Sequence, residues 1–212
     1  MATKQYQMPA GNQSALSRLA DQQNWEFWHY QTYAAAGQGS LTFFTAAPGS
    51  LSLEDYNFKA AGAFPAGMWF VLQEYMVDFT PGAAVPPSAF GAQTAARFAN
   101  DVYAAGRGGA LEFVYGNKTF CQVAPLARAP MDGGLNGFAA AADQTTAAAA
   151  SQTVLSYAQW RGRPQRVADM LIEPQVNLEW KMSWPNGAIA LPSTVAGRIG
   201  VRMKGVLGRL VQ

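Results

Sequence analysis

Few residues in this chain could act in acid–base or nucleophilic chemistry. The only histidine, His29, lies in the aromatic segment WEFWHY, and the only cysteine is Cys121. No local signature of a Ser-His-Asp triad or a Cys-His pair surrounds either of them, so we expect a packed or interfacial histidine. Glu26, Glu54 and Asp55 are the candidate acid–base carboxylates, but neighbours on a strand point to opposite faces, and nothing places a second acid opposite them. We predict no catalytic residues and no enzymatic activity.

Signatures for cofactors and metals are missing as well. The chain contains neither GxGxxG nor the P-loop pattern, and the glycines in GRGGA lack the Lys-Ser/Thr that a phosphate cradle needs. A single cysteine permits no internal disulfide and no thiolate metal cluster within one chain. We therefore predict that the protein holds no cofactor and no metal.

The charges are sparse and carry little sign of nucleic-acid binding. Charged residues make up 13% of the chain, about half of the roughly 25% typical of soluble domains, and the net charge is +2. The densest basic group is Arg161, Arg163 and Arg166 in WRGRPQR, which is either a contact patch or a solvated loop. We expect no sequence-specific nucleic-acid binding. A surface with so few charges fits subunits that cover one another.

The N-terminal segment concentrates aromatic side chains. Its apolar residues recur at three- and four-residue spacing across residues 12–36, which predicts an amphipathic helix. The ring-bearing candidates for contact with a neighbouring subunit or a membrane are Trp25, Phe27, Trp28, Tyr30 and Tyr33. We treat residues 1–36 as an N-terminal arm, helical or partly extended. The alternative is that these rings complete the core of the subunit itself.

Strand patterns dominate the rest of the chain. In VNLEWKMSW, residues 176–184, every second residue is apolar, which predicts a strand with one buried face. A second alternation at residues 199–204 follows the Pro-Asn-Gly turn, and we expect the two stretches to form one antiparallel sheet. Residues 111–115 and 119–123 predict a hairpin. Residues 88–105 predict a helix, and residues 131–153 form an Ala/Gly-rich insertion.

Further strand patterns fill the region before the predicted helix. They are LTFF from residue 41, LSLEDYNF from residue 51 and MWFVLQEYMVDF from residue 68. A chain of 212 residues can form one domain that buries roughly 70% of its unfolded surface. The first residues show neither a basic region nor an apolar core, so we expect no secretory signal.

Three of these segments together resemble the major capsid proteins of small tailless icosahedral bacteriophages. They are residues 41–79, from LTFF to MVDF; residues 108–130, GGALEFVYGNKTFCQVAPLARAP; and residues 184–212, from WPNG to the end. The resemblance implies a mainly β fold, a single jelly-roll β-sandwich over residues 37–212 with one or two helices. About eight or nine strand candidates fit one roll and not two.

The same resemblance implies a structural virion protein that self-assembles into the capsid shell. Its expected partners are copies of itself in capsomers, other virion proteins and an internal lipid membrane. Its expected location is the virion, with assembly in the host cytoplasm. The main alternative is a carbohydrate-binding β-sandwich, because Trp and Tyr on a sheet face also bind sugars. A minor capsid protein is a third hypothesis. An outer-membrane barrel fits poorly with the helix at residues 88–105.

Overall fold

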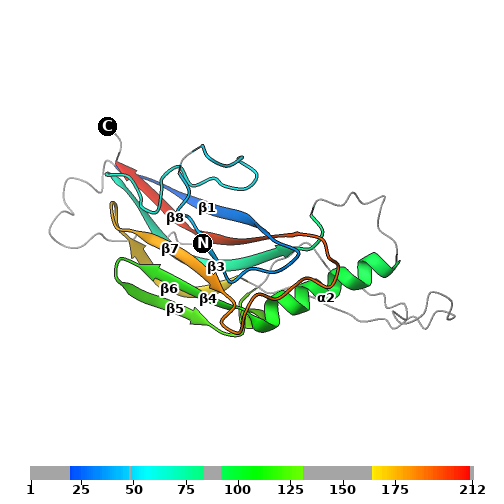
Figure 1. Cartoon of the computed structure of the whole chain (residues 1–212). Helices are drawn as coiled ribbons and strands as arrows, with labels where there is room; N and C mark the ends of the chain where they lie inside the picture. The colour runs from blue at the N-terminus through cyan, green and yellow to red at the C-terminus, as the bar shows by residue number, and fades with distance from the viewer. Residues whose placement is uncertain (1–19, 48, 84–91, 131–163, 211–212) are drawn as a thin grey trace, which may run out of the picture.

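The computed structural model describes residues 20–47, 49–83, 92–130 and 164–210, and its strands form two antiparallel sheets (Figure 1). The described elements are β1 (Ala20–Tyr33), β2 (Ser40–Phe43), β3 (Met68–Thr80), α2 (Ala92–Gly108), β4 (Ala110–Tyr115), β5 (Lys118–Val123), the short 3-10 helix η2 (Leu126–Arg128), β6 (Gln165–Ile172), β7 (Leu178–Ser183) and β8 (Gly197–Leu210).

The order of the strands is that of a jelly roll. One sheet runs β1-β8-β3-β6 and the other β2-β7-β4-β5. The β4–β5 hairpin is nested inside the pairs β3–β6, β2–β7 and β1–β8, as in one long hairpin wrapped around a core. Eight strands in two facing sheets with this nesting are the jelly-roll arrangement. The predicted mainly β sandwich is therefore confirmed.

The two C-terminal strand patterns are confirmed, but they do not form one sheet. In β7, Leu178, Trp180 and Met182 are buried, while Glu179 and Lys181 alternate with them on the other face. β7 is an interior strand of one sheet, and β8 is an interior strand of the other. The expected shared sheet is wrong because the chain between β7 and β8 crosses from one layer of the sandwich to the other.

The predicted N-terminal helix is wrong over the part of residues 12–36 that the structure describes. Ala20–Tyr33 is strand β1, and each of its residues opposes a residue of β8. The same residues that show helical spacing also contain a strand-like alternation, in which every second residue faces one side of the sheet. Phe27, His29 and Tyr33 belong to this alternation and face the core. Aromatic residues favour strands, and pairing along the whole of β8 decided the outcome. The described part of the arm is thus integral to a sheet.

Helix α2 closes one end of the sandwich, at the lower right of Figure 1. It covers most of the predicted helix, whose residues 88–91 lie outside the described part. Val102 and Ala105 belong to the common core. The indole Nε1–H of Trp184 donates to the carbonyl of Ala105 at 3.0 Å, and the Ser193 N–H donates to Asp101 Oδ1 at 2.8 Å. These contacts fix the helix to the turns that lead into β8.

The segment between β2 and β3 covers the outer edge of β1. The predicted strand at residues 51–58 is irregular, with one bridge from Tyr56 to His29. The Asn57 amide accepts from the Trp28 N–H and donates to the Glu26 carbonyl, both at 2.8 Å. These hydrogen bonds occupy backbone groups that an exposed edge would leave free for another chain.

Candidate functional site

Strands β1, β8 and β3 present a charged outer face. Arg202 on β8 forms an ion pair with Glu26 on β1, and its guanidinium lies 3.6 Å from the Asp78 carboxylate on β3. The Lys204 ammonium lies 3.6 Å from the second oxygen of Glu26. Acidic and basic groups thus alternate across three strands. Glu26, a candidate acid–base residue, is held in ion pairs with two basic side chains.

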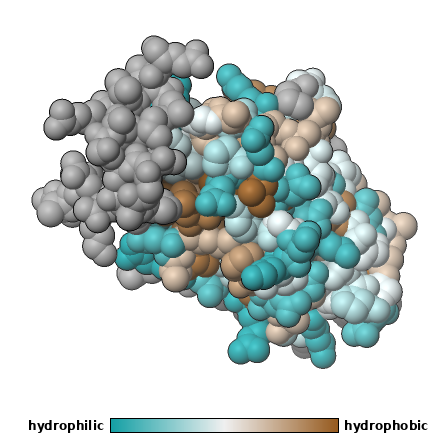
Figure 2. Space-filling view, turned by 90° about the vertical axis from the view of Figure 1, so that its left-hand side faces the viewer, coloured by the Kyte–Doolittle hydropathy of each residue, from teal (hydrophilic) through white to brown (hydrophobic). Residues whose placement is uncertain are grey.

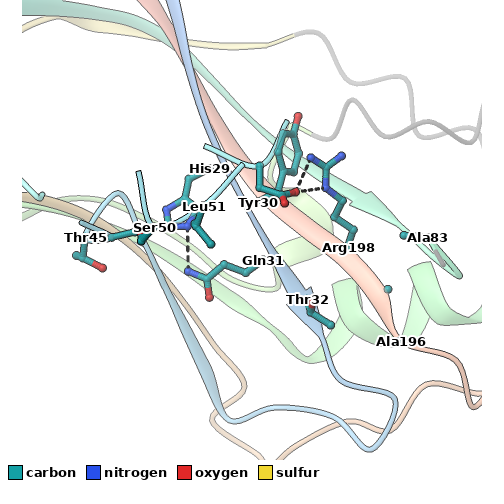
Figure 3. Close-up of a pocket in the computed structure, with 13 residues that line it drawn as sticks. His29, Tyr30, Gln31, Thr32, Thr45, Ser50, Leu51, Ala83, Ala196 and Arg198 are labelled. Atoms are coloured by element: carbon teal, nitrogen blue, oxygen red, sulfur yellow. Dashed lines mark hydrogen bonds and ion pairs between the residues drawn. The ribbon is translucent and has the colours of Figure 1, made fainter. Parts of the chain in front are cut away.

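A second group of contacts extends this network toward the segment after β2. The Tyr30 hydroxyl donates to Asp78 at 2.6 Å. Burial raises the pKa of Tyr30 most, and this hydrogen bond raises it further. The Arg198 guanidinium lies 4.0 Å from the centre of the Tyr30 ring and forms a 2.8 Å ion pair with Asp55 (Figure 3). It also donates to the Glu54 carbonyl at 2.6 Å. Arg198 therefore anchors the segment that contains both remaining candidate carboxylates.

Sequence reasoning missed the role of the two arginines. Arg198 and its partner Asp55 are 143 residues apart in the chain, and Arg202 and Glu26 are 176 apart. The alternation in β8 places both arginines on one face, which is a signal that they share an environment. The partners on β1 could be identified only once the β1–β8 register was known.

His29 is a buried structural histidine in this arrangement. Its side chain is 1% exposed, and the Phe44 N–H donates to its Nδ1 at 2.6 Å. The amide nitrogen of Gln31 lies 3.4 Å from its Nε2. Figure 3 draws this contact as a dashed line. Burial lowers the pKa of His29 to about 4, although the Asp55 carboxylate acts in the opposite direction. The imidazole is therefore neutral near pH 7 and serves as a hydrogen-bond acceptor.

A cavity of about 670 Å³ lies beside these residues (Figure 3). Four stretches of chain surround it: β1, the segment after β2, the turn after β3, and the start of β8 with the residue before it. Its lining residues are His29, Tyr30, Gln31, Thr32, Thr45, Ala46, Ser50, Leu51, Asp55, Ala83, Ala196, Gly197 and Arg198. The lining combines apolar surface with a few hydroxyl, amide and charged groups, which is the usual composition of a ligand pocket.

The low pKa of His29 predicts a loss of stability in acid. Between the ordinary pKa of 6.5 and about 4, the unfolded chain binds a proton that the folded chain does not. The free energy of unfolding must therefore fall as the pH is lowered through this window, by roughly 2–3 kcal/mol from this residue between about pH 7 and about pH 4.5. Urea denaturation at the two pH values measures the change.

The control for this experiment is His29→Phe, which cannot titrate. We expect it to be less stable than the parent near pH 7, because the Phe44 N–H loses its acceptor. Its free energy of unfolding should nevertheless fall less than that of the parent on acidification. Equal losses in the two proteins would mean that His29 has the same pKa folded and unfolded.

The five N-terminal rings do not share one surface. Phe27 and Tyr33 are core residues, 5% and 0% exposed, and the Tyr33 hydroxyl donates to the Ile189 carbonyl at 2.7 Å. This corrects the expectation that they are available to a neighbour or a membrane. Trp28 is partly buried, and its indole donates to the Leu53 carbonyl at 3.0 Å. Only Trp25, 42% exposed, is largely open, so contact through Trp25, Trp28 and Tyr30 stays a prediction.

The predicted basic patch is only partly described. Arg166 lies on β6, with its side chain 78% exposed and its guanidinium 3.8 Å from Glu74. Arg161 and Arg163 lie outside the described residues. WRGRPQR is thus not wholly a loop, because its last two residues begin a strand. The patch of three arginines itself stays a prediction.

Large exposed apolar side chains on the described surface come from five parts of the chain, and two of them, Leu51 and Leu53, share the segment after β2. They are Trp25, Leu51, Leu53, Tyr103, Phe120 and Leu171. On the side of the molecule away from α2, apolar groups form small brown areas among teal and pale side chains (Figure 2). Within the described residues, no helix is long and apolar enough to cross a bilayer. No group of three or more His, Cys, Asp or Glu in that same part of the chain could hold a metal ion.

Comparison of the chain with protein families, curated proteins and solved structures gave no significant match.

Proposed function

We propose that this chain is a structural virion protein that self-assembles into the icosahedral capsid shell of a tailless bacteriophage. The observation that carries the proposal is the nested strand order, β1-β8-β3-β6 facing β2-β7-β4-β5. Viral capsid subunits are among the main users of this eight-stranded roll. The three segments that resemble phage capsid proteins supply all or most of five of its strands, β2, β3, β4, β5 and β8, and the closing turn after β7.

The chemistry of the surface is consistent with this proposal. Interface cores are depleted in charge and enriched in aromatic residues, Met and Arg. Here 13% of residues are charged and 12% are aromatic. On the outer face of the β1-β8-β3 layer, the acids Glu26, Asp55 and Asp78 are paired with Arg198 and Arg202 within the subunit. A neighbouring subunit can cover such a face without burying unpaired charges.

In this proposal the partners are copies of the chain in capsomers, other virion proteins and an internal lipid membrane. Assembly takes place in the host cytoplasm, and the finished protein is located in the virion. No cofactor, metal or sequence-specific nucleic-acid contact is part of the proposal. Trp25, on the edge strand β1, is the aromatic side chain that we expect to contact a neighbour or the membrane, because it is the most exposed ring of β1.

Negative-stain microscopy and sedimentation velocity of the purified chain test the proposal. We expect capsomers or closed shells of uniform size, and the same protein in virions purified from its source. A chain that stays monomeric over a wide range of concentration and salt, and is absent from those virions, would exclude the proposal.

The second candidate is a carbohydrate-binding module, because lectins also use jelly rolls. The observation that favours it is the cavity of about 670 Å³ beside His29, with its hydroxyl and amide lining. A glycan array separates the two functions. Saturable binding of one sugar that is lost in Gln31→Ala, from a protein that does not assemble, would favour the module.

A further inference from the structure

The two lateral sides of the sandwich differ in shape. Strands β1 and β2 are the edge strands on one side, and β6 and β5 are the edge strands on the other. The first side contains the cavity of about 670 Å³, and the second presents the exposed ring of Phe120. Figure 1 shows the segment after β2, in cyan, at the top of the molecule and β5 at the bottom. A hollow and a projection on opposite sides suit head-to-tail association of identical subunits.

A bulge in β5 presents the ring of Phe120. Thr119 and Cys121 oppose two consecutive residues of β4, so Phe120 between them is an extra residue. Bulges bend a strand and redirect its side chains. The Phe120 side chain is 53% exposed, and its ring centre lies 5.8 Å from that of Tyr115. Aromatic side chains are enriched in interface cores, where they act as anchors that fill pockets of the partner.

The cavity on the opposite side can be reached by a side chain from outside. Thr32, Thr45, Ser50 and Leu51 line it and are exposed. Figure 3 shows these four residues around the space beside His29. The volume is within the range of pockets that hold drug-sized molecules, so the cavity has room for an aromatic ring.

The charges beside the ring and beside the cavity are opposite in sign. Lys118 is the one charged residue of β5, lies two positions from Phe120 and is exposed. On the cavity side, the Glu54 side chain is 82% exposed and lies 3.8 Å from Arg198, which lines the cavity. Opposite charges across an interface select the partner and its orientation.

We propose that subunits associate head to tail, with Phe120 of one copy inserted into the cavity of the next copy and Lys118 facing Glu54. The inference rests on the proposed capsid function and names the surfaces that join neighbours in a capsomer. A second copy is the occupant of the cavity because the ring, the hollow and both charges belong to the same chain. Repetition of such a contact closes into a ring when the rotation between neighbours divides a full turn.

Sedimentation velocity of the full chain tests the contact with two complementary variants. Phe120→Asp removes the ring and keeps the cavity, whereas Thr45→Trp fills the cavity and keeps the ring. Each variant alone should associate about thirtyfold more weakly than the parent, which is the effect of losing one interface hot spot. An equimolar mixture should form dimers and nothing larger, because the two variants can make one intact junction.

The matched controls are Tyr103→Asp, at a ring on α2 that is 57% exposed, and Ala188→Trp, at an exposed alanine in the turn after β7. Both should associate like the parent. A loss in Tyr103→Asp equal to that in Phe120→Asp, or a mixture of the two complementary variants without dimers, would overturn the contact.

Charge reversal gives a second readout that keeps the ring and the cavity. Glu54→Lys and Lys118→Glu should each weaken association about tenfold, because each places like charges opposite one another. The double variant should restore it, and since the two residues lie on opposite sides of one subunit, the rescue must act between copies. A double variant without rescue would overturn this contact alone. A parent that stays monomeric would overturn it together with the proposed function.

Discussion

Trp180→Asp is expected to destabilise the subunit severely. Trp180 is 0% exposed and stacks on Phe113 between the two sheets. Truncating a buried large aromatic residue costs about 3–5 kcal/mol, and an unpaired buried carboxylate adds a further penalty. Their sum reaches much of the 5–15 kcal/mol by which domains are typically stable, so about half or more of the stability is lost. Circular dichroism and urea denaturation of the variant measure the effect.

Trp25→Asp is the matched control, because the same change is made on the partly exposed residue of strand β1. We expect it to cost less than about 1 kcal/mol, as is usual at surface positions. Trp180→Phe, which keeps the stacking on Phe113, should fall between the two. A Trp180→Asp protein with the stability of the parent would mean that the two sheets do not pack on this ring.

The strands that sequence could predict are those with a regular alternation. In β7 and β8, apolar residues at every second position pointed to the buried face, and the structure places Trp180 and Val201 there with 0% exposure. The Gly-Asn pair between β4 and β5 predicted their hairpin, because Gly116 has φ of +59°, as the tight turn requires. These features are local, so a single sequence contains them.

Two strands could not be recognised, each for a physical reason. In β1, helical and strand periods coexisted, and only the β8 partner selects the strand. In β6, the bulge at residues 167–169 breaks the alternation that marks a strand, so the sequence reads as a loop. β6 is the edge strand of its sheet, and bulges are frequent on edge strands.

The candidate sites also depend on register and not on motifs. Arg198 meets Tyr30 because Gly200 opposes Tyr30 and leaves space above its ring, where any side chain at position 200 would collide with it. Trp180 lies beside Val167 and Met170 because the two sheets face each other. A sequence identifies these side chains as polar or apolar. Their neighbours follow from pairings between residues far apart in the chain.

Deleting residues 1–36 is expected to give insoluble or molten protein. The deletion removes strand β1, which pairs with β8 along its full length, and takes Phe27, His29 and Tyr33 out of the core. Interior strand β8 would then become an edge, with a row of unpaired backbone groups that favours aggregation. Solubility, near-ultraviolet circular dichroism and the cooperativity of thermal unfolding measure the outcome.

Deleting residues 1–19 is the matched truncation, since it retains every described strand and core residue. We expect this shorter deletion to leave a soluble subunit that unfolds cooperatively. It also restricts the proposed assembly arm to the part of the chain before β1. Folded subunits that no longer form shells would assign assembly to residues 1–19. Shells of normal size would instead place the assembly contacts on the sandwich itself.

A soluble, cooperatively folded protein lacking residues 1–36 would contradict the role of β1, because a sheet missing its edge strand and three core side chains should not retain fixed packing.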